Sequence, residues 1–160
     1  MLHISVVCVG RIREPYLLDG LREYEKRLRR FVRLEIRAVE DEPCPETLSA
    51  EEERAARETE GARLLKRLGG REYVTALDLG GRMLDSPGLA AYLAARALEG
   101  WSSQAFVIGG SLGLSPKVLE RADFRLSLSA LTFPHQLTRL ILLEQIFRAC
   151  KINSHEAYHK

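Results

Sequence analysis

The chain lacks the long apolar runs that membrane insertion requires. Nowhere in its 160 residues does an uninterrupted apolar stretch reach the about 18 residues that can span a bilayer. The amino terminus leads directly into a strand-like pattern, without the charged and apolar regions of a secretory signal. We therefore expect no membrane association and a cytoplasmic location.

Cysteine is scarce, and the spacing of the cysteines does not suit disulfide bonds or zinc coordination. Cys8, Cys44 and Cys150 are far apart, and none belongs to a C-x-x-C pair. This spacing argues against a disulfide framework and against the common zinc sites, and it favours reduced thiols. No set of His, Cys, Asp and Glu residues has the spacing of another metal site, so no metal is expected.

The sequence also has little net charge and lacks the common nucleotide-binding and nucleophile motifs. A net charge of +2 does not by itself indicate a nucleic-acid partner. Gly109, Gly110 and Gly113 follow an apolar segment, but they do not form G-x-G-x-x-G and no P-loop lysine accompanies them. No serine lies in G-x-S-x-G. The glycines still allow a flat ligand to approach the backbone closely.

Apolar periodicity and turn residues predict alternating strands and helices. Strands are expected at residues 2–9, 32–39, 73–79, 105–108 and 124–128. Helices are expected at residues 14–30, 49–68 and 86–99, with a short helix from 115 and a long one from 134. Gly80 and Gly81 should end the third strand, and Ser86 and Pro87 should be the N-cap and first residue of the following helix. This order predicts one α/β domain, residues 1–160, with helices on both faces of the sheet.

The segment from Phe124 to Cys150 combines a strand, a polar loop and a long helix. Carbonyls at the strand end and N–H groups at the helix start face one crevice, so we expect a binding edge at residues 129–133. The helix is apolar on most of its circumference, which predicts that a second subunit covers part of it and that Leu143 lies at the contact. Arg139 lies within the apolar arc and should have a fixed partner or a ligand.

Two polar segments leave their roles open. The helix over residues 14–30 carries Arg22, Lys26, Arg27, Arg29 and Arg30 away from its apolar stripe, with Arg33 just beyond. This cluster indicates either a solvated face or a contact with nucleic acid. The tail SHEAYHK places His155, Tyr158 and His159 within six residues; they are either incidental or able to stack on a base and exchange protons.

Three runs of the sequence resemble one protein family: GGSLGLS, LSLSALTFPHQLTRLILLEQIFRA and EAYHK. The family is the small knotted methyltransferases of the SPOUT class, and within it the RlmH type, which methylates N3 of a pseudouridine in 23S (large-subunit) ribosomal RNA. The resemblance spans the whole chain, including CVGRIRE, EYEKRL and VTALDLGGRMLDS. Phe147 stands where tyrosine is usual, and Ala76 where threonine is expected.

The resemblance implies a mostly parallel sheet with helices on both faces, a C-terminal trefoil knot and a homodimer. It implies S-adenosylmethionine as cofactor, held by the backbone at Leu77, Gly109, Leu128, Ser129, Ala130, Leu131, Thr132 and Phe133. The candidates for handling the N3 proton are Tyr158, His159, His135, Arg139 and Arg148. Tyr158 and His159 are favoured for placing the base, in their own or the partner's site.

Other functions remain open at this point. A related knotted methyltransferase could act on transfer RNA, and a non-catalytic dimeric RNA-binding module could use the same crevice. For the favoured function, the partner is large-subunit ribosomal RNA or an assembled ribosome. We also expect a branched side chain at Gly109 to enter the crevice, and loss of the tail to leave stability nearly unchanged.

Overall fold

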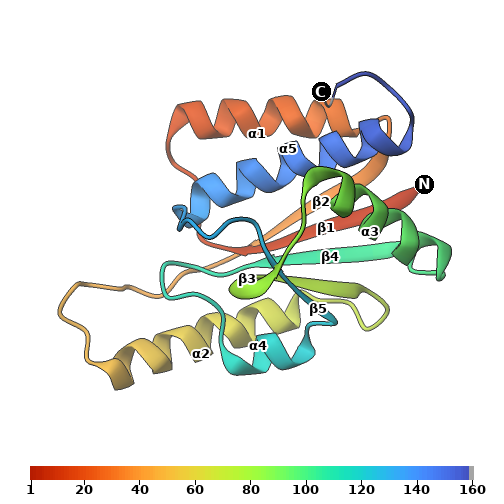
Figure 1. Ribbon diagram of the computed structural model, residues 1–160. Coiled ribbons are helices and arrows are strands. Elements are labelled where there is room, and N and C mark those ends of the chain that lie inside the picture. The colour runs from red at the N-terminus through yellow and green to blue at the C-terminus, as the bar shows by residue number, and fades with distance from the viewer. Residues whose placement is uncertain (159–160) are drawn as a thin grey trace.

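Strand β1 (Leu2–Val9) lies inside the sheet, as its nearly continuous apolar sequence predicts. In the computed structural model, which describes residues 1–158, β1 pairs with strands β2 and β4 (Figure 1). The other strands are β2 (Val32–Val39), β3 (Tyr73–Met83), β4 (Ser103–Ile108) and β5 (Phe124–Ser127). Their order is β2-β1-β4-β3-β5, and every pair is parallel. The predicted α/β fold with a parallel sheet is confirmed, and the trefoil knot stays a prediction.

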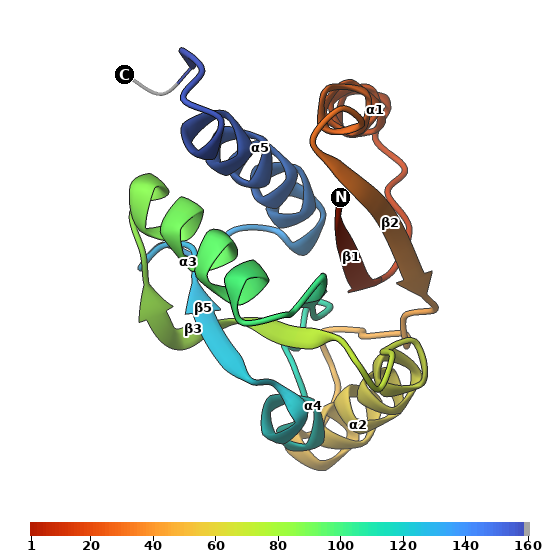
Figure 2. The ribbon, with the colours of Figure 1, turned by 90° about the vertical axis from the view of Figure 1, so that its right-hand side faces the viewer.

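Helices cover both faces of this sheet (Figure 2). In the described part of the chain they are α1 (Pro15–Leu28), α2 (Ala50–Lys66), α3 (Ser86–Leu98), α4 (Pro116–Arg121) and α5 (His135–Asn153). Helix α5 packs between α1 and α3 on one face, and α2 packs against α4 on the other. None of the helices in residues 1–158 is long and apolar enough to cross a membrane.

Alternate side chains of β1 supply the two cores. Ile4, Val6 and Cys8 join the core beneath α1, α3 and α5, whereas Val7 and Val9 join the core beneath α2 and α4. Because successive strand side chains point to opposite faces, a strand buried on both sides needs an unbroken apolar run. The β1 sequence therefore places this strand in the interior of the sheet.

Strand β3 is longer than its sequence predicts. It continues through Gly80 and Gly81 to Met83, and its pairing with β5 shifts register between Leu77 and Arg82. A Cβ atom at Gly81 would lie 2.7 Å from the carbonyl carbon and oxygen of Arg125. The prediction that these glycines end the strand is wrong, because Gly81 instead allows β5 to approach closely.

Two helix starts lie one residue away from their predicted positions. The side chain of Asp85, not that of Ser86, caps α3 by accepting a hydrogen bond of 2.7 Å from Gly88 N. Ser86 Oγ instead donates to Gln145 Oε1 at 2.7 Å and ties α3 to α5. Pro134 has an extended ψ of 139°, so it occupies the N-cap position and α5 begins at His135.

Most of helix α5 is buried within its own chain. Leu142, Leu143 and Ile146 have no exposed surface, and all belong to the core shared with α1 and α3. The prediction that Leu143 contacts a second subunit is therefore wrong. Leu137 and Ile141 remain only half-buried. Helical periodicity identified the two arcs of α5 but could not tell which arc its own chain covers.

Truncation of Leu143 tests this assignment. Because Leu143 is fully buried, Leu143→Ala should lower the free energy of unfolding by about 3 kcal/mol through lost burial and a residual cavity. Leu98→Ala is the matched control, since Leu98 is 90% exposed and should change stability by less than about 0.5 kcal/mol. Urea unfolding of both variants measures the difference. Equal stabilities would remove Leu143 from the core.

Candidate functional site

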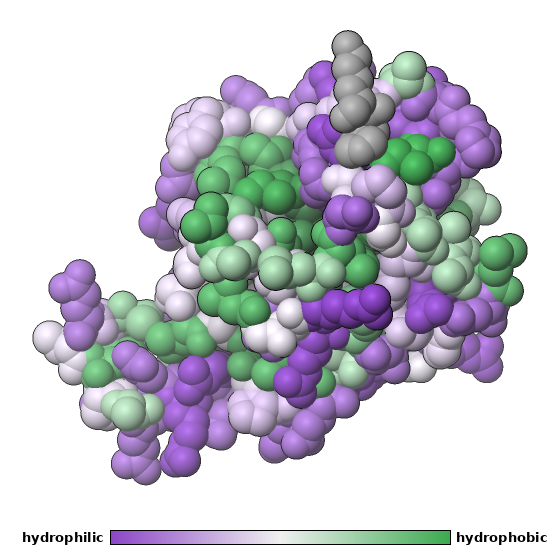
Figure 3. Space-filling model, in the orientation of Figure 1, coloured by the Kyte–Doolittle hydropathy of each residue, from purple (hydrophilic) through white to green (hydrophobic). Residues whose placement is uncertain are grey.

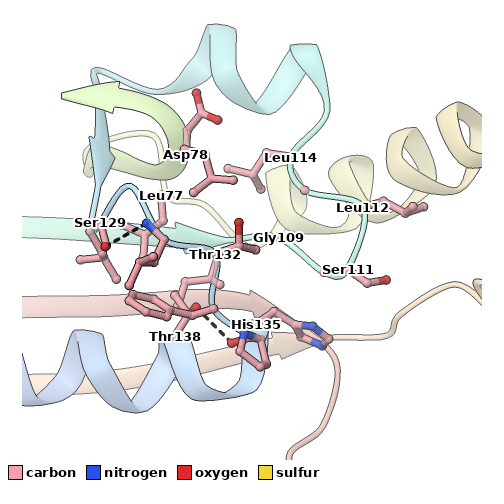
Figure 4. A pocket seen from close by; sticks show the side chains of 18 residues that line it. Leu77, Asp78, Gly109, Ser111, Leu112, Leu114, Ser129, Thr132, His135 and Thr138 are labelled. Carbon is pink, nitrogen blue, oxygen red and sulfur yellow. Dashed lines mark hydrogen bonds between the residues drawn. The ribbon is translucent and has the colours of Figure 1, made fainter. Parts of the chain in front are cut away.

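A cavity of about 790 Å³ lies at the carboxyl ends of β3, β4 and β5, next to the start of α5 (Figure 4). Parallel sheets characteristically bind ligands at this edge. Three segments line the cavity, namely residues 77–79, 108–114 and 128–135 without residue 130, and Thr138 adds to them from α5. The carboxyl ends of three strands therefore meet at one place, and each is followed or lined by residues that the resemblance assigns to the cofactor.

The predicted cofactor residues and the cavity wall agree closely. The wall includes Leu77, Gly109, Leu128, Ser129, Leu131, Thr132 and Phe133. Ala130 is the exception and does not line the cavity. The geometry thus brings together segments that are separated in the sequence by 28 and 13 residues, as the strand order requires.

The glycine loop after β4 is a tight turn. Gly113 N donates a hydrogen bond of 3.0 Å to Gly110 O, and Gly113 has a φ of +79°, which favours glycine. A Cβ atom at Gly109 would lie 2.7 Å from both the carbonyl carbon and oxygen of Gly113. The expectation for Gly109 therefore needs correction: an added side chain meets the backbone of the loop itself, and not only the open crevice.

The second loop, from Ser129 to Pro134, is held by short-range hydrogen bonds. Ser127 Oγ donates to Ser129 O at 3.0 Å, and Leu131 N donates to Ser129 Oγ at 3.0 Å. At the far end, Thr138 Oγ1 donates to Pro134 O at 3.1 Å. These bonds fix the backbone of a loop that lines the cavity, and Figure 4 shows Ser129 and Thr132 of this loop at the cavity wall.

The cavity has one acidic and one imidazole side chain on its wall. Of the lining residues, Asp78 of β3 and His135 of α5 are the ionisable ones, and Figure 4 shows them on opposite sides. Burial lowers the pKa of His135, and the positive charge of Arg139 adds to this effect. At neutral pH the wall therefore presents a carboxylate and an uncharged imidazole. This environment suits a cationic or neutral ligand better than an anionic one.

Helix α2 supports the glycine loop from behind. Arg57 donates a hydrogen bond of 3.3 Å to Leu112 O. Glu60 is 4% exposed; its Oε2 accepts a bond of 3.0 Å from Glu42 N, and a Cβ atom at Gly110 would lie 3.1 Å from its Oε1. Burial raises the pKa of Glu60. Sequence reasoning missed Asp78, Arg57 and Glu60, because charged residues on a polar helix or at a strand end resemble solvated surface.

The structure separates the predicted catalytic residues into two groups. His135 lines the cavity. Arg139 is buried near it, but its guanidinium donates to the carbonyls of Val9 and Gly10, at 3.4 and 3.0 Å, and so ties α5 to the end of β1. Arg148 and Tyr158 lie toward the opposite end of the 19-residue helix α5, which is about 28 Å long. His159 lies outside the described residues.

Tyr158 packs onto its own chain beside α1 and α5. Its hydroxyl donates to Glu144 Oε1 at 3.3 Å and lies 3.3 Å from the Tyr24 hydroxyl, and its ring contacts Phe147 with 4.9 Å between centroids. The hydrogen bond with Tyr24, then burial and Glu144, raise the pKa of Tyr158 to about 12. The expectation that the tail contributes little to the core is wrong for Tyr158. Glu144 also forms an ion pair with Arg148, and the Arg148 guanidinium lies 4.8 Å from the Tyr158 ring centre.

Comparisons with known proteins agree over nearly the whole chain. A family model described as "Predicted SPOUT methyltransferase" matches residues 2–159. The chain is 53% identical over 160 residues to the ribosomal RNA large subunit methyltransferase H of Desulfitobacterium hafniense strain DCB-2, and covers 100% of both proteins. It is 50% identical over 159 residues to the protein of the same name from Clostridioides difficile, covering 99% of this chain and 100% of the relative.

Solved structures share the fold at low sequence identity. A probable methylase family protein from Haemophilus influenzae superposes with a TM-score of 0.56 at 12% identity, over 98% of this chain and 70% of the other. The tRNA (m1G37) methyltransferase from Aquifex aeolicus gives a TM-score of 0.52 at 14% identity, over 92% of this chain and 69% of the other. At these identities the likeness concerns the fold alone.

Proposed function

Because the chain belongs to the SPOUT methyltransferase family and is a methyltransferase, we propose that it transfers a methyl group from S-adenosylmethionine to N3 of a pseudouridine in 23S ribosomal RNA. The observation that supports this most directly is the cavity, whose wall contains all but one of the residues that the resemblance assigns to the cofactor. The names of relatives that are about half identical over their full length support the RNA class.

The cavity fits the chemistry of this cofactor. Its volume of about 790 Å³ lies within the range of small-molecule binding sites. A carboxylate and a neutral imidazole on an otherwise uncharged wall are compatible with a positively charged sulfonium. The cofactor supplies an electrophilic methyl group, so the protein has to align the target nitrogen with it and manage the N3 proton.

His135, at the start of α5, and Tyr158, in the tail after α5, are the residues proposed to handle the N3 proton. His135 is at the cavity wall, and its lowered pKa leaves a free nitrogen lone pair near neutral pH. Tyr158, with its pKa raised to about 12, stays protonated; by giving up its hydrogen bond to Glu144, its hydroxyl can donate to an anion that develops on the base. We propose that Tyr158 and His159 place the target base, with His135 beside the cofactor.

We propose that a second copy of the chain completes this arrangement. The Tyr158 hydroxyl lies beside Glu144, which follows His135 by nine residues, or about 14 Å along α5, so we propose that Tyr158 serves the cavity of a partner. Figure 3 shows an apolar surface over α5, where Leu137 and Ile141 are half-buried, and Leu131 beside it is 70% exposed. We propose that two chains associate through this surface.

Charge placed on this surface tests the dimer. Leu137→Glu combined with Ile141→Glu should give a monomer, since two carboxylates in an apolar contact lose hydration without gaining partners. Light scattering measures the mass, and thermal unfolding checks that the chain stays folded. Leu98→Glu is the control, because Leu98 is 90% exposed at the end of α3. A double variant that remains dimeric would place the interface elsewhere.

Methyl transfer to defined RNA tests the function itself. Labelled S-adenosylmethionine is offered with free large-subunit RNA, large subunits, whole ribosomes and transfer RNA, and the modified nucleoside is identified. Label in N3-methylpseudouridine from one of the three ribosomal substrates is the expected result. Label in transfer RNA alone would replace the proposed substrate by the class named for the Aquifex aeolicus protein.

A further inference from the structure

The small net charge of the chain hides two oppositely charged regions. Residues 22–33 contain six basic and two acidic side chains, whereas residues 40–53 contain seven acidic side chains and no basic ones. The first region covers the carboxyl half of α1 and the start of β2, and the second covers the loop before α2 and its first turn. Helices α1 and α2 lie on opposite faces of the sheet (Figure 2). An anionic partner is therefore attracted to one face and repelled from the other.

Several cations of the first region have no carboxylate partner among residues 1–158. Arg22 and Lys26 of α1 and the C-cap residue Arg29 follow one another at helical spacing. Arg33 follows at the start of the edge strand β2, where it alternates with Val32 and Leu34 of the core beneath α1 and so points away from that core; all four cations are exposed. Among the described residues, Lys26, Arg29 and Arg33 form no ion pair, and Arg22 only a loose one, 3.6 Å from Asp19. We call these four residues the basic face.

Neighbouring cations behave differently, which sets the basic face apart. Arg27 is paired with Glu23, and Arg30 is paired with Glu156, while the Arg30 guanidinium also lies 4.5 Å from the ring centre of Phe31. The charges of Arg27 and Arg30 are therefore already paired within the protein. The charge of Lys26, Arg29 and Arg33 remains available to a ligand.

The carboxyl-terminal tail lies against the same half of α1 that carries Lys26 and Arg29. The contact between the Tyr24 and Tyr158 hydroxyls, at 3.3 Å, and the ion pair of Arg30 with Glu156 hold the tail against the same half of α1. RNA whose target base reaches Tyr158 would reach Lys26 and Arg29 by passing around the carboxyl end of α1, because these two residues lie on the other side of the helix from Tyr24.

We propose that the basic face binds the phosphate backbone of the RNA substrate, next to the target nucleotide, on the protomer that supplies Tyr158. This inference rests on the proposed function. Guanidinium groups bind phosphate oxygens with paired N–H donors, and the contact carries no sequence information. Its role is to hold the RNA across the two chains, with the backbone on α1 of one chain and the base at the cavity of the other.

A triple charge reversal tests the proposal against a matched control. The test variant carries Lys26→Glu, Arg29→Glu and Arg33→Glu. The control carries Lys66→Glu, Arg71→Glu and Lys117→Glu, three exposed cations that also form no ion pair among the described residues. The two variants change the net charge equally. RNA affinity, measured on the ribosomal substrate that wild-type enzyme methylates, is followed over a range of salt, and S-adenosylmethionine affinity by calorimetry.

The test variant should bind RNA about 100-fold more weakly, and its slope of log affinity against log salt should fall by about 2, as expected for three lost contacts to a single strand. Cofactor affinity should stay within twofold in both variants. A third variant, with Lys26→Arg, Arg29→Lys and Arg33→Lys, keeps all three positive charges. It should retain most of the wild-type affinity for RNA.

Equal loss of RNA affinity in test and control variants would overturn the proposal, because net charge alone would then explain it. Unchanged affinity in the test variant would overturn it as well. If the wild-type protein sediments with phosphatidylserine vesicles and the test variant loses only that binding, the face belongs to a membrane surface instead. Failure of the proposed function looks different, because wild-type enzyme would then methylate no ribosomal substrate.

Discussion

Gly109→Val should abolish measurable binding of S-adenosylmethionine, with a loss of at least about 100-fold, or about 2.7 kcal/mol. Gly109 follows the end of β4 at the cavity wall, and its added Cβ would lie 2.7 Å from the Gly113 carbonyl. Real Cβ atoms do not approach a backbone carbonyl so closely, so the loop from Gly109 to Gly113 has to open. The wall of the cavity proposed to bind the cofactor is therefore displaced.

Calorimetry measures the affinity, and circular dichroism shows whether the sheet is retained. Gly109→Ala should already weaken binding, because the clash begins at Cβ. Gly70→Val is the control: a Cβ atom at Gly70 would meet nothing within 4 Å, and Gly70 lies outside the cavity. Unchanged cofactor affinity in a folded Gly109→Val variant would move the cofactor site away from this cavity.

Loss of Tyr158 to Lys160 should remove methyl transfer by at least about 100-fold, within the range that a proton-handling group contributes, while cofactor binding is retained. The structure adds a cost in stability, since Tyr158 contacts Phe147 and Glu144; we expect about 1 kcal/mol. Tyr158→Phe keeps the ring and removes only the hydroxyl, so it separates packing from chemistry. A truncated enzyme that works at the full rate would leave the tail without a catalytic role.

Mixing two inactive variants shows whose cavity the tail serves. In a mixed dimer of the truncated chain and Gly109→Val, one cavity binds cofactor and the other chain supplies Tyr158. If the tail acts in the partner's site, unfolding and refolding the two variants together should restore about a quarter of the wild-type activity, as random pairing into two-fold dimers predicts. A tail that acted within its own chain would leave every mixed dimer inactive, and the separation of Tyr158 from its own cavity along α5 would then need another explanation.

Local patterns in the sequence were sufficient for the order and type of every strand and helix in the described chain. The apolar run of β1 predicts its burial on both faces, and the predicted and observed bounds of β1 and β2 coincide. The resemblance likewise supplied the residues of the cavity wall, apart from Ala130. These features depend on residues that are close in the sequence, or on motifs that the family retains.

Other features were decided only by tertiary structure. The covered arc of α5, the continuation of β3 past Gly81 and the carbonyl partners of Arg139 all depend on segments far away in the sequence. Periodicity states which residues share a side of a helix, but not what lies against that side. The distance between His135 and Tyr158 is of the same kind. Both were candidates for one site from chemistry alone, but the fold places His135 at the cavity and packs Tyr158 against Glu144 and Phe147, farther along α5.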